Sequence, residues 1–438
     1  MHTLRRIPYY GFFILLIYMP FHIFLAQWLS SFTGGVEVWK IAKDVVLFGL
    51  VLFTICLIFV ERAGGRLFYW LLGGGVIYGL VHLGLWAVHP GIFSESAALG
   101  IVYNNRLWCF LLLGFGAALL NRDKFVFSSV IKIVIGVTSV VALLGVLQYF
   151  LPKDVLTHFG YGLERGARPA FFIDDNPALP RIMSTLREPN ALGAYLLVPV
   201  SILTALVIKI RDSRRTLLVG LLLLHGLALF LTFSRSAWLG TALAVSIILW
   251  WGYKDKMRNV SKRYWPLVVL VPVLLVAGIF ALRNTPFFQG YITHATVDET
   301  NDLDSNDYHA QLVREGLDGV IDQPQGHGPG TAGLASIRDP GGGQLTENYY
   351  VQIAYEVGVL GLLVFAAISV LVYYNLWCRK DWIGTVLIAG FWGYVVMNTL
   401  LHTWSNEAVA SQWWLLAGAA LAPIIVGRSV STKKHGVS

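Results

Sequence analysis

Long apolar stretches alternate with short polar ones along the whole chain, and this alternation predicts its architecture. About 20 apolar residues suffice for a helix to cross the hydrocarbon core of a membrane. Several of the predicted spans are shorter, which leaves half-spans as an alternative. The pattern predicts about twelve spans, near residues 7–29, 44–60, 67–88, 106–120, 125–151, 190–209, 216–233, 236–252, 266–282, 351–375, 382–401 and 412–427.

The composition supports a polytopic all-α membrane protein. Of 438 residues, 56% are hydrophobic and 13% are charged, whereas a soluble domain carries about 25% charged residues. The net charge of +8 says little about nucleic acid in such a protein, and we expect no nucleic-acid partner. Cys56, Cys109 and Cys378 lie in separate apolar segments without metal-ligand spacing, so we expect neither a disulfide nor a metal site. The first apolar run is too long for a signal-peptide core and is interpreted as a retained span.

The distribution of Lys and Arg predicts the orientation. With the amino terminus inside, the short loops on the inner side are rich in these residues, as the positive-inside rule requires. Both termini are then cytoplasmic, and two larger loops, 152–189 and 283–350, are extracytoplasmic. The predicted organisation is spans one to nine in residues 1–282, an outer loop with short helices in 283–350, and three spans with a cytoplasmic tail in 351–438.

Basic residues on the predicted outer side are mostly arginines. The outer lysines are Lys40, Lys43 and Lys153. Because guanidinium groups bind phosphate in a bidentate geometry, this bias suggests a bound anion. The arginines concerned are Arg106, Arg165, Arg168, Arg181, Arg187, Arg235, Arg283, Arg314 and Arg338.

Two of these arginines lie beside predicted helix ends. In LREPNALGAYL, Pro189 suits the first turn of a helix, which places Arg187 next to free backbone N–H groups. In LTFSRSAWLG, Arg235 lies in a very short turn between two spans. Each arginine is either part of an anion site or an interfacial cation, with Trp238 as an aromatic anchor in the second case.

The outer loop contains an amphipathic segment and a glycine-rich turn. HAQLVREGLDGVID has apolar residues at 312, 313, 317, 320 and 321, which predicts a helix of about 15 residues that His309 opens and that contains Arg314. Pro324 ends it, and His327 lies in the following turn, PQGHGPG. The Walker pattern is absent, so nucleotide binding is disfavoured. The alternative is a helix stop with flexible backbone.

Polar residues enter the tenth predicted span. Asn348, Gln352 and Glu356 are spaced at i, i+4 and i+8, so they share one helix face, and Tyr350 lies beside them. Polar groups in a span usually face a cavity or a functional path. Glu356 could instead neutralise a structural arginine. Glu347 lies at the mouth of this helix.

Together these motifs resemble the O-antigen ligase and O-antigen polymerase superfamily of bacterial envelope glycosyltransferases. The resemblance covers about residues 180–375 and rests on LREPNALGAYL, LTFSRSAWLG, PQGHGPG and ENYYVQIAYEVGVLG, in that order. It implies a glycan donor on undecaprenyl pyrophosphate, a lipid, glycan or protein acceptor, surrounding membrane lipids, and no nucleotide sugar, metal or cofactor. Arg187 and Arg235 match the arginines thought to hold the pyrophosphate.

The sequence departs from the family at two positions. Glu347 stands where relatives commonly carry a histidine, in an HNxYLQ-like motif, and His309 stands where many carry an arginine. Since a carboxylate can act as a general base, Glu347 is the first candidate for this role, followed by His327 and His309. His309 and Arg314 are further candidates for the pyrophosphate, and Asn348, Tyr350, Gln352 and Glu356 for substrate binding.

The resulting hypothesis is an inverting glycosyltransferase of the bacterial inner membrane, either a ligase or a polymerase, with an extracytoplasmic active site. A transporter or flippase of lipid-linked oligosaccharides is the rival. It would be expected to show two related halves with polar helices near the membrane midplane, a symmetry that this sequence lacks. A purely structural protein would leave Gln352 and Glu356 unexplained.

Overall fold

The computed structural model describes residues 3–89, 94–173, 176–252, 305–338 and 343–422. Several sequence predictions lie outside these ranges. They are the ninth span at 266–282, the basic loop at 253–264, residues 283–304 of the outer loop with Arg283, and the tail from residue 423 onward.

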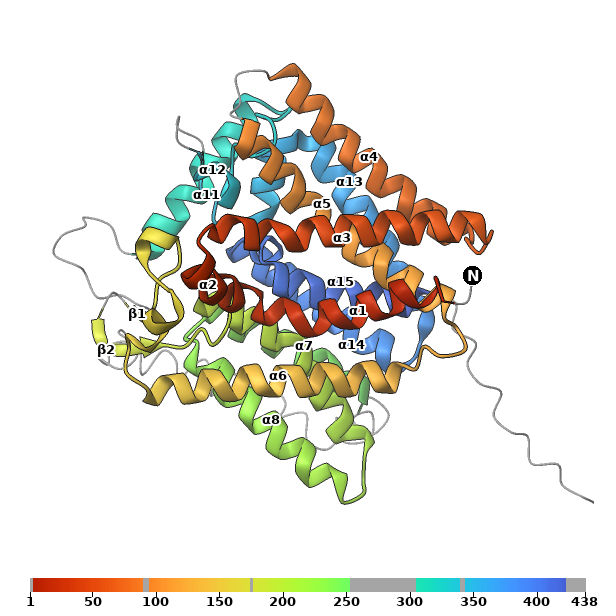
Figure 1. Cartoon of the computed structure of the whole chain (residues 1–438), viewed down its shortest axis with the longest axis vertical. Coiled ribbons are helices and arrows are strands. Elements are labelled where there is room, and N and C mark those ends of the chain that lie inside the picture. The colour runs from red at the N-terminus through yellow and green to blue at the C-terminus, as the bar shows by residue number, and fades with distance from the viewer. Residues whose placement is uncertain (1–2, 90–93, 174–175, 253–304, 339–342, 423–438) are drawn as a thin grey trace, which may run out of the picture.

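Helices make up most of the described chain (Figure 1). Residues 235–252 are also helical. The α-helices are α1 Arg6–Tyr18, α2 His22–Thr33, α3 Val36–Val60, α4 Arg66–Val88, α5 Ser94–Leu120, α6 Phe127–Phe150, α7 Pro189–Lys209, α8 Arg214–Leu231, α11 Ser305–Asp322, α12 Gly333–Ser336, α13 Tyr349–Arg379, α14 Trp382–Leu400 and α15 Glu407–Leu421. Short 3-10 turns are η1 Met19–Phe21, η2 Val155–Phe159, η3 Leu163–Arg165 and η5 Thr403–Ser405.

The protein is a multi-pass membrane protein with an α-helical bundle. Within the described residues, nine helices are long and apolar enough to cross a membrane, where α1, η1 and α2 count as one. These nine match predicted spans, although α5 begins about twelve residues before the predicted start of its span at 106. In Figure 1, α4 and α8 lie at opposite edges, and α15 lies in the middle of the bundle.

Several predicted cytoplasmic loops meet at one end of the bundle. Arg5 pairs with Glu61 at 2.7 Å, and Asn121 donates a hydrogen bond to the Arg5 carbonyl at 2.8 Å. Arg379 donates to the carbonyl of Ala420 at the same end. The β-hairpin, α11 and α12 lie at the opposite end from the amino terminus (Figure 1). This arrangement agrees with two groups of loops on opposite faces.

The last helix differs from its prediction. The sequence predicts a span at 412–427, whereas α15 is Glu407–Leu421, only 15 residues long, and every residue from Ala408 to Leu421 is buried. Such a helix measures about 22 Å, too short to cross the membrane untilted. Gly114 of α5 and Gly418 of α15 allow close approach, since a Cβ on either would lie about 2 Å from a backbone oxygen of the other helix. The segment is therefore a central packing element.

The predicted span at 351–375 is broken within α13. Val357 and Gly358 have non-helical dihedral angles, and Gly358 has a φ of 69°. The break frees the carbonyls of Tyr355 and Glu356, which accept hydrogen bonds from the N–H groups of His327 and Gly328, both at 2.8 Å. A broken helix is tolerated in a bundle when other groups satisfy its backbone. The glycine-rich turn thus completes α13 rather than remaining a flexible helix stop.

A small β-hairpin interrupts the first outer loop, and the all-α prediction missed it. β1 Phe171–Ile173 pairs antiparallel with β2 Asn176–Arg181, and Phe171 lies opposite Arg181. Neither strand shows the alternating apolar pattern that marks a strand in sequence. Residues 181–188 connect the hairpin to the start of α7.

Replacing Gly330 with alanine should destabilise the fold strongly. Its φ is +79°, and an added Cβ would lie 2.1 Å from the carbonyl oxygen of Ser96. The left-handed conformation alone costs about 1–2 kcal/mol, and the backbone contact adds to it. The measurement is the thermal unfolding midpoint in detergent. Gly166→Ala is the control, since Gly166 has a left-handed φ of 66° and ψ of 25° and nothing within 4 Å; equal losses in both variants would exclude a packing role for Gly330.

Candidate active site

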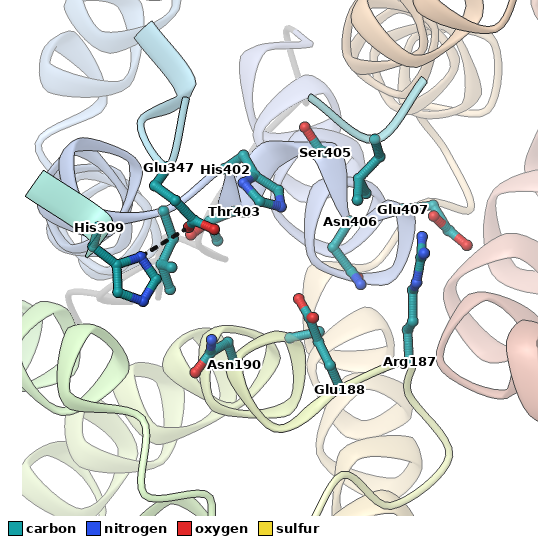
Figure 2. Close-up of a pocket in the computed structure, with 13 residues that line it drawn as sticks. Arg187, Glu188, Asn190, His309, Glu347, His402, Thr403, Ser405, Asn406 and Glu407 are labelled. Carbon is teal, nitrogen blue, oxygen red and sulfur yellow. Dashed lines mark ion pairs between the residues drawn. The ribbon is translucent and has the colours of Figure 1, made fainter. Parts of the chain in front are cut away.

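Three helix amino termini converge on one small cavity. It has a volume of about 140 Å³, and its wall includes Arg187 and Glu188 before α7, Glu347 before α13, and Asn406 and Glu407 at the start of α15. We call it the central cavity (Figure 2). Each helix amino terminus contributes partial positive charge to the cavity, beside the side chains of Glu188, Glu347 and Glu407. α7 begins at Pro189, as predicted, and its N-cap Glu188 makes no side-chain capping bond.

Glu347 lies on the wall of the central cavity opposite Arg187 (Figure 2). Its φ of 47° is unusual for a residue other than glycine, and such strain often accompanies functional sites. His309 Nδ1 lies 3.6 Å from a carboxylate oxygen of Glu347. Burial acts to raise the pKa of Glu347, but the interactions with His309 and His402 outweigh it and hold the pKa below its ordinary value. Glu347 is therefore a carboxylate at neutral pH.

Arg187 is exposed at the edge of the central cavity. Among the described residues it has no hydrogen-bond or ion-pair partner. Glu188 and Asn406 lie between it and Glu347 in Figure 2, and Asn190 lies below Glu347. An arginine with free donors, placed beside a helix amino terminus, suits an oxyanion ligand.

Arg235 lines a second cavity that adjoins the central one. This hairpin cavity has a volume of about 530 Å³, and Asn190, His309 and Glu347 line both cavities. Arg235 is half-buried at the start of the helix of residues 235–252, next to Ser236, which also lines the cavity. Its apolar wall includes Phe233, Val313, Leu400 and Leu401.

Arg181 is a site residue that the sequence motifs did not single out. Its Nε donates to the Thr232 carbonyl and its Nη2 to Asn190 Oδ1, both at 2.9 Å. It lines the hairpin cavity with Arg235. Arg181 thus joins β2, the turn before Arg235 and the first turn of α7. The only sequence signal for it was the arginine bias of the predicted outer face.

His402 and Asn190 were also missed, although both line the central cavity. His402 precedes α15 in HTWSNEA, a run in which Asn406 caps the helix by accepting bonds from the N–H groups of Ala408 and Val409. A polar residue before an apolar run is a helix-start signal. It could have marked Asn406 as a helix start, but not the proximity of this start to those of α7 and α13.

Two predicted site residues lie away from the three convergent helix ends. His327 stacks on Tyr355 with ring centroids 4.0 Å apart, and it lines neither the central nor the hairpin cavity. Burial lowers its pKa. Arg314 is exposed on α11 and also lies outside both walls. His309, by contrast, lines both cavities; it lies within α11, which already begins at Ser305.

The four predicted substrate-binding residues on α13 have structural surroundings. Asn348 caps α13 and donates to the Thr399 carbonyl at 3.0 Å. Glu356 is fully buried, accepts from Asn104, and accepts from the N–H group of Gly330 at 3.1 Å. Gln352 packs against Gly333, and Tyr350 lies near Phe365. None of the four lines the central or hairpin cavity.

The surroundings of Glu356 also test its alternative role, which is to neutralise a structural arginine. Among the described residues, Glu356 pairs with no arginine, so it does not neutralise one there. Its carboxylate instead holds α5 and the glycine-rich turn against the broken part of α13. The cysteines are unpaired, and no cluster of His, Cys, Asp or Glu in the described part of the chain could hold a metal.

The comparison with known protein families matches one part of the chain that contributes residues to this site. Residues 219–366 match the O-antigen ligase family model. The match supports membership of the O-antigen ligase and polymerase superfamily, which confirms the resemblance predicted from the motifs. No curated protein matches the chain.

The O-antigen ligase match contains Arg235, His309 and Glu347, whereas Arg181 and Arg187 precede it. The family implies an O-antigen ligase-like or polymerase-like function and lipid-linked glycan substrates. The structure brings the residues inside and outside the matched region to adjoining cavities. Segments inside and outside the matched region therefore both contribute residues to the site.

Proposed function

We propose that the protein is an inverting glycosyltransferase that transfers a glycan from undecaprenyl pyrophosphate to an acceptor hydroxyl. The reaction would take place on the extracytoplasmic side of the bacterial cytoplasmic membrane. The observation that carries this proposal is the carboxylate of Glu347 between two adjoining cavities, one with Arg187 and the other with Arg235. A base and two phosphate-binding cations then face one reaction space.

The proposed step is a substitution at the anomeric carbon. The acceptor oxygen forms a bond to this carbon while its proton passes to Glu347. The bond between the carbon and the pyrophosphate oxygen breaks, and its electron pair stays on the lipid pyrophosphate. Arg187 and Arg235 stabilise the negative charge that develops on this leaving group. The proton then leaves Glu347 for solvent, and the anomeric centre is inverted.

The hairpin cavity fits the lipid end of the donor. Arg181 and Arg235 supply guanidinium groups, while Phe233, Leu400 and Leu401 supply apolar surface. A lipid pyrophosphate needs both kinds of contact at headgroup depth. We assign Arg181 a positioning role, since it holds Asn190 and the turn before Arg235 in place.

Release of undecaprenyl pyrophosphate tests the proposal. Purified protein is incubated with an undecaprenyl pyrophosphate oligosaccharide and candidate acceptors, without nucleotide or metal. We expect free undecaprenyl pyrophosphate and an extended acceptor. Movement of intact donor across vesicles without bond cleavage would instead favour a flippase. Extension of a glycan on its own carrier identifies a polymerase, whereas transfer to another lipid, glycan or protein identifies a ligase.

A further inference from the structure

A further cavity lies at the opposite ends of three helices that carry the candidate active site. Its wall is formed by the end of the helix of residues 235–252, the end of α13 and the start of α14. It has a volume of about 500 Å³, within the range of small-molecule sites. We call it the tryptophan cavity, after Trp250, Trp251 and Trp377 in its wall.

The tryptophan cavity and the hairpin cavity lie about one membrane thickness apart. Leu400, the last residue of α14, lines the hairpin cavity, whereas Asp381, the N-cap of α14, lines the tryptophan cavity. A helix of 19 residues measures about 28 Å, close to the thickness of a hydrocarbon core. The tryptophan cavity therefore lies at the other membrane surface, which is the predicted cytoplasmic one.

The wall of the tryptophan cavity suits the headgroup level of a membrane. Trp250 is 63% exposed, Trp377 59% and Trp251 39%. Their indole N–H groups donate to no described residue. Tryptophan is enriched at membrane surfaces because it combines apolar area with one polar donor. With the half-buried Ile247, which also lines the cavity, these rings offer accessible apolar surface to the upper part of an acyl chain.

The tryptophan cavity also has an accessible cation without a partner. Lys380 is exposed, and its ammonium group has no hydrogen bond or ion pair with any described residue. Asp381 is the carboxylate of the described wall, and its two oxygens accept hydrogen bonds from Arg379 at 3.2 and 2.6 Å. Because Arg379 already neutralises Asp381, Lys380 leaves the wall attractive to an anion.

We propose that the tryptophan cavity binds an anionic phospholipid of the surrounding membrane. The lipid phosphate meets Lys380, and the upper acyl chain lies against Ile247 and the exposed tryptophans. A lipid bound there joins the ends of three helices whose other ends lie at the candidate active site. The proposal does not depend on the transfer reaction, because the cavity shares no residue with the central or hairpin cavity.

Two substitutions of exposed side chains test the proposal, each with a matched control. Lys380→Gln removes the cation, and Lys124→Gln is its control, because Lys124 is an exposed lysine at the same end of the bundle that does not line the cavity. Trp377→Leu removes an aromatic ring from the wall. Its control is Trp70→Leu, since Trp70 is 66% exposed near the start of α4 and lies outside the cavity.

The experiment compares phosphatidylglycerol with phosphatidylcholine of the same acyl chains. Each lipid is titrated into the delipidated full-length protein in detergent, and native mass spectrometry measures the Kd of the first bound lipid. We expect phosphatidylglycerol to bind about fivefold more tightly, the effect of one lysine near an anionic lipid. Lys380→Gln should abolish this preference and Lys124→Gln should keep it. Trp377→Leu should weaken the binding of both lipids, and Trp70→Leu should leave it unchanged.

Equal affinity of the wild-type protein for the two phospholipids would overturn the proposal. So would a full preference in Lys380→Gln, or an equal loss in Lys380→Gln and Lys124→Gln, which would assign the preference to the general charge of this end. Displacement of phosphatidylglycerol by an equal concentration of undecaprenyl phosphate would assign the cavity to the carrier lipid instead. A second readout is the thermal unfolding midpoint, which phosphatidylglycerol should raise more in the wild-type protein than in Lys380→Gln.

Discussion

Arg235→Ala is expected to lower glycan transfer by about 100- to 1,000-fold, the usual cost of removing one donor that stabilises developing negative charge. Arg235 lines the hairpin cavity beside Arg181 and Ser236. Its guanidinium group would meet the pyrophosphate as the bond to the sugar breaks. The measurement is the rate of undecaprenyl pyrophosphate release at saturating acceptor.

Arg235→Lys separates charge from geometry. Lysine keeps the positive charge but loses the planar fork that binds phosphate in a bidentate manner. We expect an intermediate rate. Arg211→Ala is the control, because Arg211 is exposed between α7 and α8, away from all the described cavities. A wild-type rate in Arg235→Ala, with Arg211→Ala unchanged, would exclude Arg235 from the pyrophosphate site.

Glu347→Gln is expected to reduce the turnover number by about 100- to 10,000-fold, the contribution of a positioned general base. The KM for the donor should change little, because glutamine has nearly the same shape as glutamate. Steady-state kinetics with varied donor concentration measure both quantities. A larger effect on donor KM than on turnover would assign Glu347 to donor binding.

The pH profile gives an independent test of Glu347. A base acts only in its deprotonated form, and the pKa of Glu347 is lowered from its ordinary value of 4.5. The wild-type rate should therefore stay constant through neutral pH and fall only below about pH 4.5. Glu347→His, which introduces the residue common in relatives, should retain activity with its acidic limb moved to about pH 6.5. If the acidic limb of the pH–rate profile of Glu347→His did not shift, another group would be the base.

The positions of Arg187 and Arg235 beside helix ends were predictable because their signals are local. LREPN predicts a helix start, and the polar LTFSR between two apolar runs predicts a tight turn. The structure confirms that α7 begins at Pro189 and that residues 232–234 form the turn. The sequence likewise indicated Glu347 at the mouth of the tenth span, and the structure adds that Asn348 caps α13.

The role of the polar face of α13 could not be predicted in the same way. Periodicity places Gln352 and Glu356 on one face, but it does not say what that face meets. The glycine-rich turn fills this position, since Gly330 donates to Glu356 and Gly333 packs on Gln352. The helix break at Gly358 adds backbone contacts between this turn and α13, because the freed carbonyls of Tyr355 and Glu356 accept hydrogen bonds from the N–H groups of His327 and Gly328.

The sequence by itself determined the membrane class, most of the spans and the helix ends beside which Arg187, Arg235 and Glu347 lie, because apolar periodicity, charge and helix-start residues act within a few positions of one another. Only the tertiary structure decided that the starts of α7, α13 and α15 meet at one cavity and that this central cavity adjoins the hairpin cavity. These meetings join segments far apart in the chain. They depend on how the whole bundle packs, and no local pattern specifies that packing.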